Sequence, residues 1–361
     1  MSEGVITLKR NYGIDLLRIV AMIFVVILHI TGVGGICSAA ELGSPQFFLA
    51  QFLRIATYCA VNCYALISGF VGWNRTPKLS ALLNLWVKVI LFCVSITVFT
   101  QLRDPAAVGL ADLWKAFTPV TAASYWYFNA YVALFFFIPL FNHGIRHISG
   151  REAIFALTGV SLVLLSLQFS RLRDTFQLGG GYSTLWLMIL YLAGGLMARF
   201  DIPGKLRKRW WALGYLLAVC ASFLPRMAMV ILDPQLWSPE NYNLSMQYIS
   251  PSVVLASVAL AGFFSRLQLR ETAVRVIKAI SPHTFGVYLL HTNTLIFLTA
   301  IYGRFAWLAT APVWKLVAVT AGVTALIFFG GIAADWLLTQ GMRLLGISRL
   351  LKKLDGKLSV K

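Results

Sequence analysis

The sequence predicts an all-α, polytopic membrane protein of about ten transmembrane helices, and two observations carry that prediction. Hydrophobic residues make up 59% of the 361 positions, the mean hydropathy is +0.76, and charged residues account for only 12%. A soluble domain of this size carries about twice that share of charge. Apolar runs also recur along the whole length, each close to the roughly 20 residues that a helix needs to cross a bilayer. We therefore expect residues 1–361 to form a single membrane domain.

Ten apolar segments predict the individual spans. They are 13–33, 50–72, 80–100, 124–142, 152–170, 183–200, 210–232, 248–265, 284–302 and 313–341. The first is expected to remain in place rather than to be cleaved as a signal peptide, because Asp15, Arg18 and His29 interrupt its apolar run. The last is the longest, and we expect it to tilt or to emerge from the membrane.

The basic residues predict the orientation of these spans. Most of the 31 Lys and Arg residues fall in the two termini and in alternate loops, and the opposite loops hold only a few. Those few are Arg103, Lys115, Arg171, Arg173, Arg304 and Lys315. Because Lys and Arg in short loops stay on the cytoplasmic side, both termini are expected to be cytoplasmic. This pattern is typical of a multi-pass protein of an inner or plasma membrane.

The net charge of +18 does not indicate a nucleic-acid partner, because the basic residues are spread over short loops and form no single patch. Membrane lipids are the expected contact, above all for the basic segment 266–280, which we expect to lie along the cytoplasmic face. The five cysteines have no paired spacing and mostly fall inside apolar runs, so they are expected to be core residues and not metal ligands or disulfides.

The first span carries three ionisable side chains on one face. Arg18 and His29 are eleven residues apart, which is about three helical turns and about 16 Å along the axis, and Asp15 lies three residues before Arg18 on the same face. Asp15 and Arg18 could be anchors at the membrane surface, and His29 could simply hydrogen-bond another helix. Their combination favours a cavity or pathway, since an arginine inside a membrane costs about 2.5–3.5 kcal/mol.

A second pair of polar residues occurs near the end of the chain, in SPHTFGVYLLHTN at 281–293. Tyr288 and His291 are three residues apart and share one helical face inside the ninth predicted span. Ser281 and Pro282 favour a helix start. His283, at that start, is expected to be an interfacial residue without a catalytic role.

Four stretches together resemble one known family. Arg18 and His29 form an R-x10-H pattern after ID-x-LR, NCYALISGF covers 62–70, SYWYFNAYVALFFFIPLF covers 124–141, and SPHTFGVYLLH begins at 281. In this order they resemble the integral-membrane acyltransferase family 3, in the polysaccharide O-acetyltransferase type that lacks a fused extracellular domain. Ser68 and Gly69 of the second stretch also fit simple helix packing, and Trp126 of the third fits an interfacial anchor as well as a sugar platform.

The resemblance implies an acyltransferase that moves an acetyl group from cytoplasmic acetyl-CoA to a hydroxyl of a cell-surface glycan or of its lipid-linked precursor. Acetyl-CoA would be a co-substrate, and no tightly bound cofactor or metal is expected. His29 is then the leading general base. Arg18 would bind the CoA phosphates, together with Arg75 and Lys78 of the following loop, while Asp15 would orient Arg18. His291 and Tyr288 would orient His29 or stabilise the oxyanion.

One alternative from another class stays open. Arg54, Lys88 and Arg226 also fall inside predicted spans, and buried charges often line a transport pathway. The chain could therefore be a transporter of an anionic or acylated glycoconjugate. The sequence shows neither an inverted repeat nor paired Gly/Pro-broken segments, which argues against this alternative.

Overall fold

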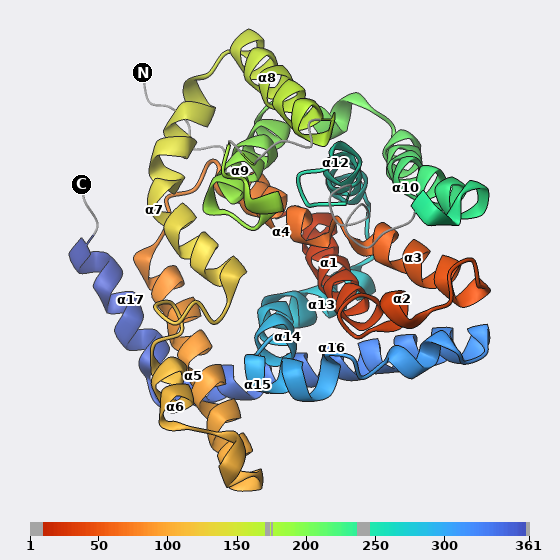
Figure 1. Ribbon diagram of the computed structural model, residues 1–361. Helices are drawn as coiled ribbons and strands as arrows, with labels where there is room; N and C mark the ends of the chain where they lie inside the picture. Colours follow the sequence, from red (N-terminus) through yellow and green to blue (C-terminus); the bar gives the residue numbers. More distant parts are fainter. Residues whose placement is uncertain (1–9, 170–173, 175, 237–245, 359–361) are drawn as a thin grey trace.

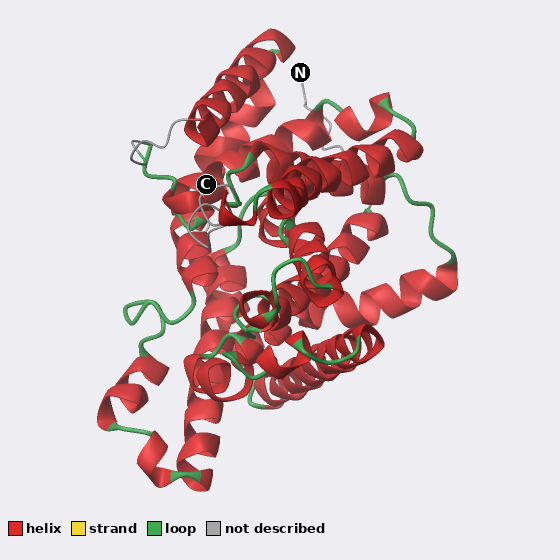
Figure 2. Ribbon diagram, turned by 45° about the vertical axis from the view of Figure 1, so that its right-hand side comes forward, coloured by secondary structure: helices red, strands yellow, loops and turns green. Residues whose placement is uncertain are grey.

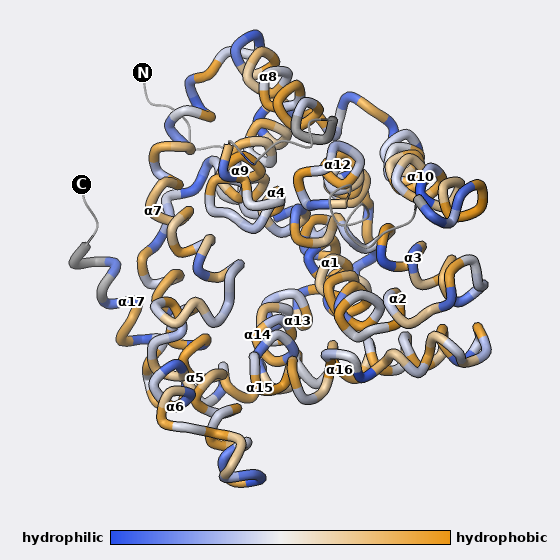
Figure 3. Tube along the Cα trace, in the orientation of Figure 1, coloured by the Kyte–Doolittle hydropathy of each residue, from blue (hydrophilic) through white to orange (hydrophobic). Residues whose placement is uncertain are grey.

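The computed structural model describes residues 10–169, 174, 176–236 and 246–358. Within these residues the regular structure is entirely helical (Figure 1, Figure 2), so the predicted all-α class is confirmed. Hydrophobic residues dominate the middle of the helices, and many hydrophilic residues lie in the connections and at helix ends (Figure 3).

The helices follow the predicted apolar segments in order. The first half of the chain forms α1 (Tyr12–Thr31), α2 (Ile36–Ala39), α3 (Pro45–Thr57), α4 (Ala60–Gly72), α5 (Leu79–Arg103), α6 (Leu110–Phe117), α7 (Trp126–His147) and α8 (Gly150–Phe169). The second half forms α9 (Thr184–Arg199), α10 (Lys208–Leu232), α12 (Pro251–Ser265), α13 (Glu271–Ile280), α14 (Thr284–His291), α15 (Thr294–Ile296), α16 (Val313–Leu344) and α17 (Ile347–Leu358). A π-helical turn, Phe297–Ile301, continues α15.

Among the described residues, six helices are long and apolar enough to cross a membrane: α1 with α2, α3 with α4, α5, α7, α10 and α16. A seventh span results if Glu271–His291 and Thr294–Ala309, which meet at a bend of 59°, cross together. The predicted spans 183–200 and 248–265 correspond to α9 and α12, which have 16 and 15 residues. These helices are only about 24 and 22 Å long, shorter than a hydrocarbon core of about 30 Å. The count of ten spans and the orientation of the termini therefore stay predictions.

Helix α1 lies in the middle of the bundle (Figure 1), where α3, α4, α12, α14 and α16 pack around it. The Asn11 side chain caps its first turn by accepting the N–H of Ile14, and the same side chain donates to the carbonyl of Ser265 at the end of α12. The cap therefore also fixes where α1 begins relative to α12. As a result, the face that carries Asp15, Arg18 and His29 is held inside the protein.

Small residues let α4 and α9 approach closely. A Cβ atom added to Gly69 would lie 1.9 Å from the carbonyl oxygen of Tyr191, and one added to Gly194 would lie 2.1 Å from that of Leu66. Each contact is far below van der Waals distance, so both positions require glycine. This arrangement is the helix packing that the Ser68-Gly69 pair predicts.

Candidate active site

The structure brings His29 of α1 and His291 of α14 into direct contact. The Nδ1 atom of His29 lies 3.1 Å from Nε2 of His291, and the two rings are tilted, with centroids 5.2 Å apart. His291 is almost completely buried, whereas His29 is partly exposed. Two residues that are 262 positions apart in the chain therefore form one polar site in an apolar interior.

The hydrogen bonds fix which nitrogen of each neutral ring carries the proton. Nδ1 of His291 faces the carbonyl oxygen of Val287 at 2.5 Å, so it donates there. A neutral imidazole has one N–H, and Nε2 of His291 is then an acceptor. His29 therefore donates from Nδ1, which leaves its Nε2 lone pair free to accept a proton.

Packing around α14 holds this pair in place. A Cβ added to Gly331 of α16 would lie 2.4 Å from Cα of Val287, so the two helices touch backbone to backbone beside the carbonyl that binds His291. On the other side, the ring of Phe297 meets the His29 ring edge to face at 5.5 Å. The imidazole of His29 is thus held by both a hydrogen bond and an aromatic contact.

The other end of the polar face of α1 forms a compact ion cluster. Asp15 is buried, and its carboxylate accepts from Arg18 at 3.0 Å and from Nε of Arg10 at 2.6 Å. The Tyr64 hydroxyl donates to the backbone carbonyl of Arg18 at 2.7 Å, which ties α4 to this turn. One carboxylate is shared by two guanidinium groups, so the cluster keeps a net positive charge.

Arg18, Arg75 and Lys78 line one cavity of about 680 Å³, which we call the proximal cavity. Arg18 comes from α1, and the other two come from the loop that joins α4 to α5. The buried amide of Asn142 holds this loop by donating to the carbonyls of Gly72 and Arg75 at 3.0 and 2.9 Å. The three cations that the sequence singles out are therefore neighbours.

Residues that the sequence analysis passed over complete this cavity. Tyr131 of α7 and Tyr191 of α9 line it, and the Tyr191 hydroxyl donates to the Asn142 side chain at 2.8 Å. The sequence did not single out Asn142, because this residue comes directly after the stretch 124–141 that resembles the family. An amide side chain at the junction of an apolar run and a basic loop is the sequence signal that could have identified it.

A row of tyrosines lies between the proximal cavity and the histidine pair. The ring centroids of Tyr64 and Tyr127 are 6.3 Å apart, and those of Tyr127 and Tyr288 are 6.5 Å apart. The Tyr127 hydroxyl is buried and has no hydrogen-bond partner in the described part of the chain.

Tyr288 lies on α14 three residues before His291, and its role in orienting His29 or stabilising the oxyanion stays a prediction. Its ring packs against Tyr125, Tyr127 and Phe285, and among the residues described it makes no hydrogen bond to His29 or His291. The i, i+3 spacing puts Tyr288 and His291 on neighbouring sides of α14, but the tyrosine turns toward α7. Tyr288 is therefore one of the row of tyrosines.

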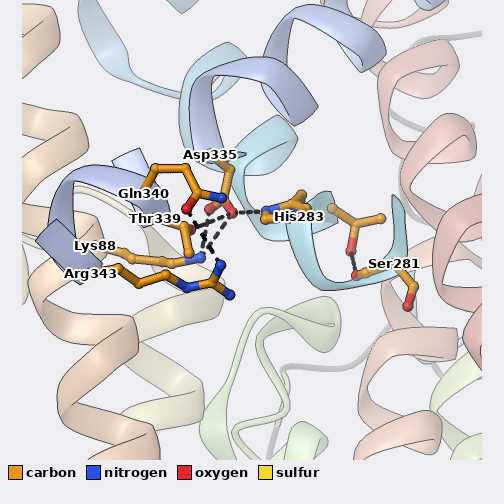
Figure 4. A network of polar contacts seen from close by, with 8 residues as sticks. Lys88, Ser281, His283, Asp335, Thr339, Gln340 and Arg343 are labelled. Carbon is orange, nitrogen blue, oxygen red and sulfur yellow. Dashed lines mark hydrogen bonds and ion pairs between the residues drawn. The ribbon is translucent and has the colours of Figure 1, made fainter. Parts of the chain in front are cut away.

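A second buried polar network joins α5 and α16 to His283, in the turn that precedes α14 (Figure 4). Asp335 is fully buried and accepts from Nζ of Lys88 at 2.8 and 3.0 Å, from Nδ1 of His283 at 2.6 Å and from the Thr339 hydroxyl at 3.3 Å. The His283 side chain is only 15% exposed and pairs with Asp335, while its expected interfacial position stays a prediction. Lys88 is neutralised by this partner, which removes one of the three charges that motivated the transport alternative.

The described residues contain no group of three or more His, Cys, Asp or Glu side chains that could hold a metal ion. A comparison with family models matches residues 11–332 to a family described as an acyltransferase domain. No curated protein and no solved structure matches the chain.

Proposed function

The chain belongs to acyltransferase family 3 and is a multi-pass membrane protein, and from that premise we propose that it is an O-acyltransferase. It moves an acetyl group from cytoplasmic acetyl-CoA to a hydroxyl of a cell-surface glycan or of its lipid-linked precursor. The observation that supports this best is the His29–His291 hydrogen bond, which leaves one imidazole nitrogen free at a fixed position.

In this proposal the proximal cavity binds the donor. Coenzyme A presents several phosphates, and the planar guanidinium of Arg18 suits a phosphate through two parallel hydrogen bonds. Arg75 and Lys78 add two more cations to the same cavity. Asp15 holds Arg18 in position, while Arg10 supplies a second positive charge to Asp15.

The distance along α1 suits the shape of the donor. Arg18 and His29 are separated by about 16 Å along the helix axis, so the long arm of coenzyme A extends from the cavity to the histidine pair. In this proposal the arm passes the row of tyrosines, and the buried Tyr127 hydroxyl, which has no partner among the described residues, hydrogen-bonds an amide of the arm. Tyr288 contributes to the wall of the same passage.

The transfer itself needs one base and no metal. Nε2 of His29 accepts the proton of the acceptor hydroxyl while the hydroxyl oxygen attacks the thioester carbonyl. A C–O bond forms, the C–S bond breaks, and the departing thiolate takes the proton back from His29. His291 holds the His29 ring in the required tautomer throughout, because it accepts from Nδ1.

The test is acetyl transfer from radiolabelled acetyl-CoA to a glycolipid extract, using purified protein in lipid. We expect His29→Ala to lower the rate by about 10²- to 10⁴-fold, because it removes the general base. His147→Ala is the matched control, since that histidine is exposed and lies far along the chain from the site. Wild-type rates from a correctly folded His29→Ala protein would show that His29 is not the base.

A further inference from the structure

A second cavity opens at the other end of α1. It has a volume of about 660 Å³ and includes Gly32 and Val33, which directly follow α1. We call it the distal cavity. Gly32 is three residues beyond His29, about 4.5 Å further along the axis, whereas Arg18 and the proximal cavity lie in the opposite direction. The histidine pair therefore stands between the two cavities.

Gln51 of α3 lines the distal cavity with an unused acceptor. Its side chain is 2% exposed, and within the described part of the chain its Oε1 atom has no hydrogen-bond partner. Leaving a buried acceptor unpaired is energetically costly. Gln51 lines the cavity, and an unpaired amide oxygen on such a residue suits a ligand that donates a hydrogen bond, as a hydroxyl does.

Arg54 lines the same cavity one turn further along α3, on the same face as Gln51. Its Nε atom lies 3.7 Å from the Cβ position of Gly32, and its guanidinium is close enough to the Cys37 thiol to interact with it. The guanidinium carries five N–H donors, which suit ring, hydroxyl and acidic oxygens. Gln51 and Arg54 therefore offer an acceptor and several donors side by side.

Glycine residues form another part of the wall of the distal cavity. Gly35 and Gly303 line the cavity with positive φ angles of 98° and 67°, which favour glycine. The 303–305 turn is held to the end of α1 by two hydrogen bonds, from the N–H of Gly303 to the carbonyl of Val33 and from that of Phe305 to Gly34. The cavity is thus a fixed feature of the fold, within the volume range of sites for small molecules.

Resting on the proposed function, we infer that the distal cavity binds the acceptor as a polyhydroxylated saccharide, and that Gln51 and Arg54 determine its affinity. The acceptor and donor then reach His29 from opposite ends of α1. The saccharide hydroxyl donates to Gln51, and its neighbouring oxygens accept from Arg54.

The experiment compares acceptor and donor dependence in the same preparations. Purified protein in lipid is given acetyl-CoA and increasing amounts of a host-membrane extract, used as separate water-soluble saccharide and glycolipid fractions. We expect Gln51→Leu and Arg54→Gln each to raise the acceptor concentration for half-maximal transfer by about tenfold or more. The half-saturating acetyl-CoA concentration and the slow acceptor-free release of CoA stay at wild-type values. Arg54→Lys, which keeps the charge, should recover part of the loss.

Arg304→Gln is the matched control, because Arg304 is an exposed cation next to the cavity whose hydrogen bond, among the described residues, goes to the Thr299 carbonyl. Unchanged acceptor dependence in both Gln51→Leu and Arg54→Gln, with normal CoA release, would overturn the acceptor site and leave the proposed function intact. Absence of both transfer and CoA release from the wild-type protein would instead refute the proposed function.

Binding without turnover separates these outcomes further. The extract is titrated into His29→Ala protein, and intrinsic tryptophan fluorescence is followed with and without the additional Gln51→Leu change. A weaker response in the double variant supports the site, and equal responses contradict it.

Discussion

Replacing Asp335 with leucine should destabilise the protein strongly. Asp335 is fully buried, and its carboxylate pairs with the Lys88 ammonium, whose side chain is only 15% exposed, and with His283. The substitution removes the anion and leaves the Lys88 cation in an apolar interior. Breaking a buried pair in this way costs about 3–5 kcal/mol, which lowers the ratio of folded to unfolded protein by about 10²- to nearly 10⁴-fold.

The assay is reversible unfolding by SDS in mixed micelles, followed by tryptophan fluorescence for wild type, Asp335→Leu, Lys88→Met and the double variant. We expect the double variant to recover most of the loss, because two apolar side chains replace the pair and no charge is left alone. A loss below about 1 kcal/mol for Asp335→Leu would place the network in the range of solvated surface pairs. It would refute the argument that burial makes this pair costly to break.

Two further predictions concern helix packing and the end of the chain. Gly69→Ala should separate α4 from α9 and cost about 1–3 kcal/mol in the same assay, because its Cβ would meet the Tyr191 carbonyl at 1.9 Å; Gly159→Ala, with open space around it, should not destabilise the protein. Hydrogen bonds from the hydroxyl and the backbone N–H of Ser80 hold the pKa of the Asp355 carboxyl below its ordinary value of 3.8. The contact therefore stabilises the protein at pH values above 3.8, and this stability is lost as the pH falls through the lowered pKa. A nitroxide label on α17 should gain mobility only in that acidic range. A label that is already mobile at pH 6 would contradict this prediction.

The sequence predicted the helical class and the positions of the helices, because apolar runs of membrane length leave little choice of structure. The family resemblance implied that Arg18, Arg75 and Lys78 act together, and these three cations line the proximal cavity. Spacing within one helix, however, says nothing about the partner that each side chain meets. The same spacing rule puts Asp15 beside Arg18, where they form an ion pair, and Tyr288 near His291, where no hydrogen bond joins the two side chains among the described residues.

Contacts between distant segments cannot be read from local sequence patterns. His29 and His291 meet because α14 packs on both α1 and α16, and only the family resemblance led to the expectation that His291 orients His29. Asp335 looked like one polar residue in a long apolar helix, and its partners lie 247 and 52 positions away. Gln51 was not predicted as a site residue, because a sequence shows neither that the amide is buried nor that its oxygen lacks a partner among the described residues.

The anchoring of α5 bears on where this protein can be shortened. The family match ends at residue 332, yet both acids that bind α5 lie beyond it: Asp335 on Lys88, and Asp355 on Ser80, eight residues earlier in that helix. A chain cut at the family boundary would keep every residue of the proposed chemistry and lose both of these attachments. The residues that stabilise the fold therefore extend beyond the family match. In a chain shortened to residue 332, α5 would be the helix that loses its attachments.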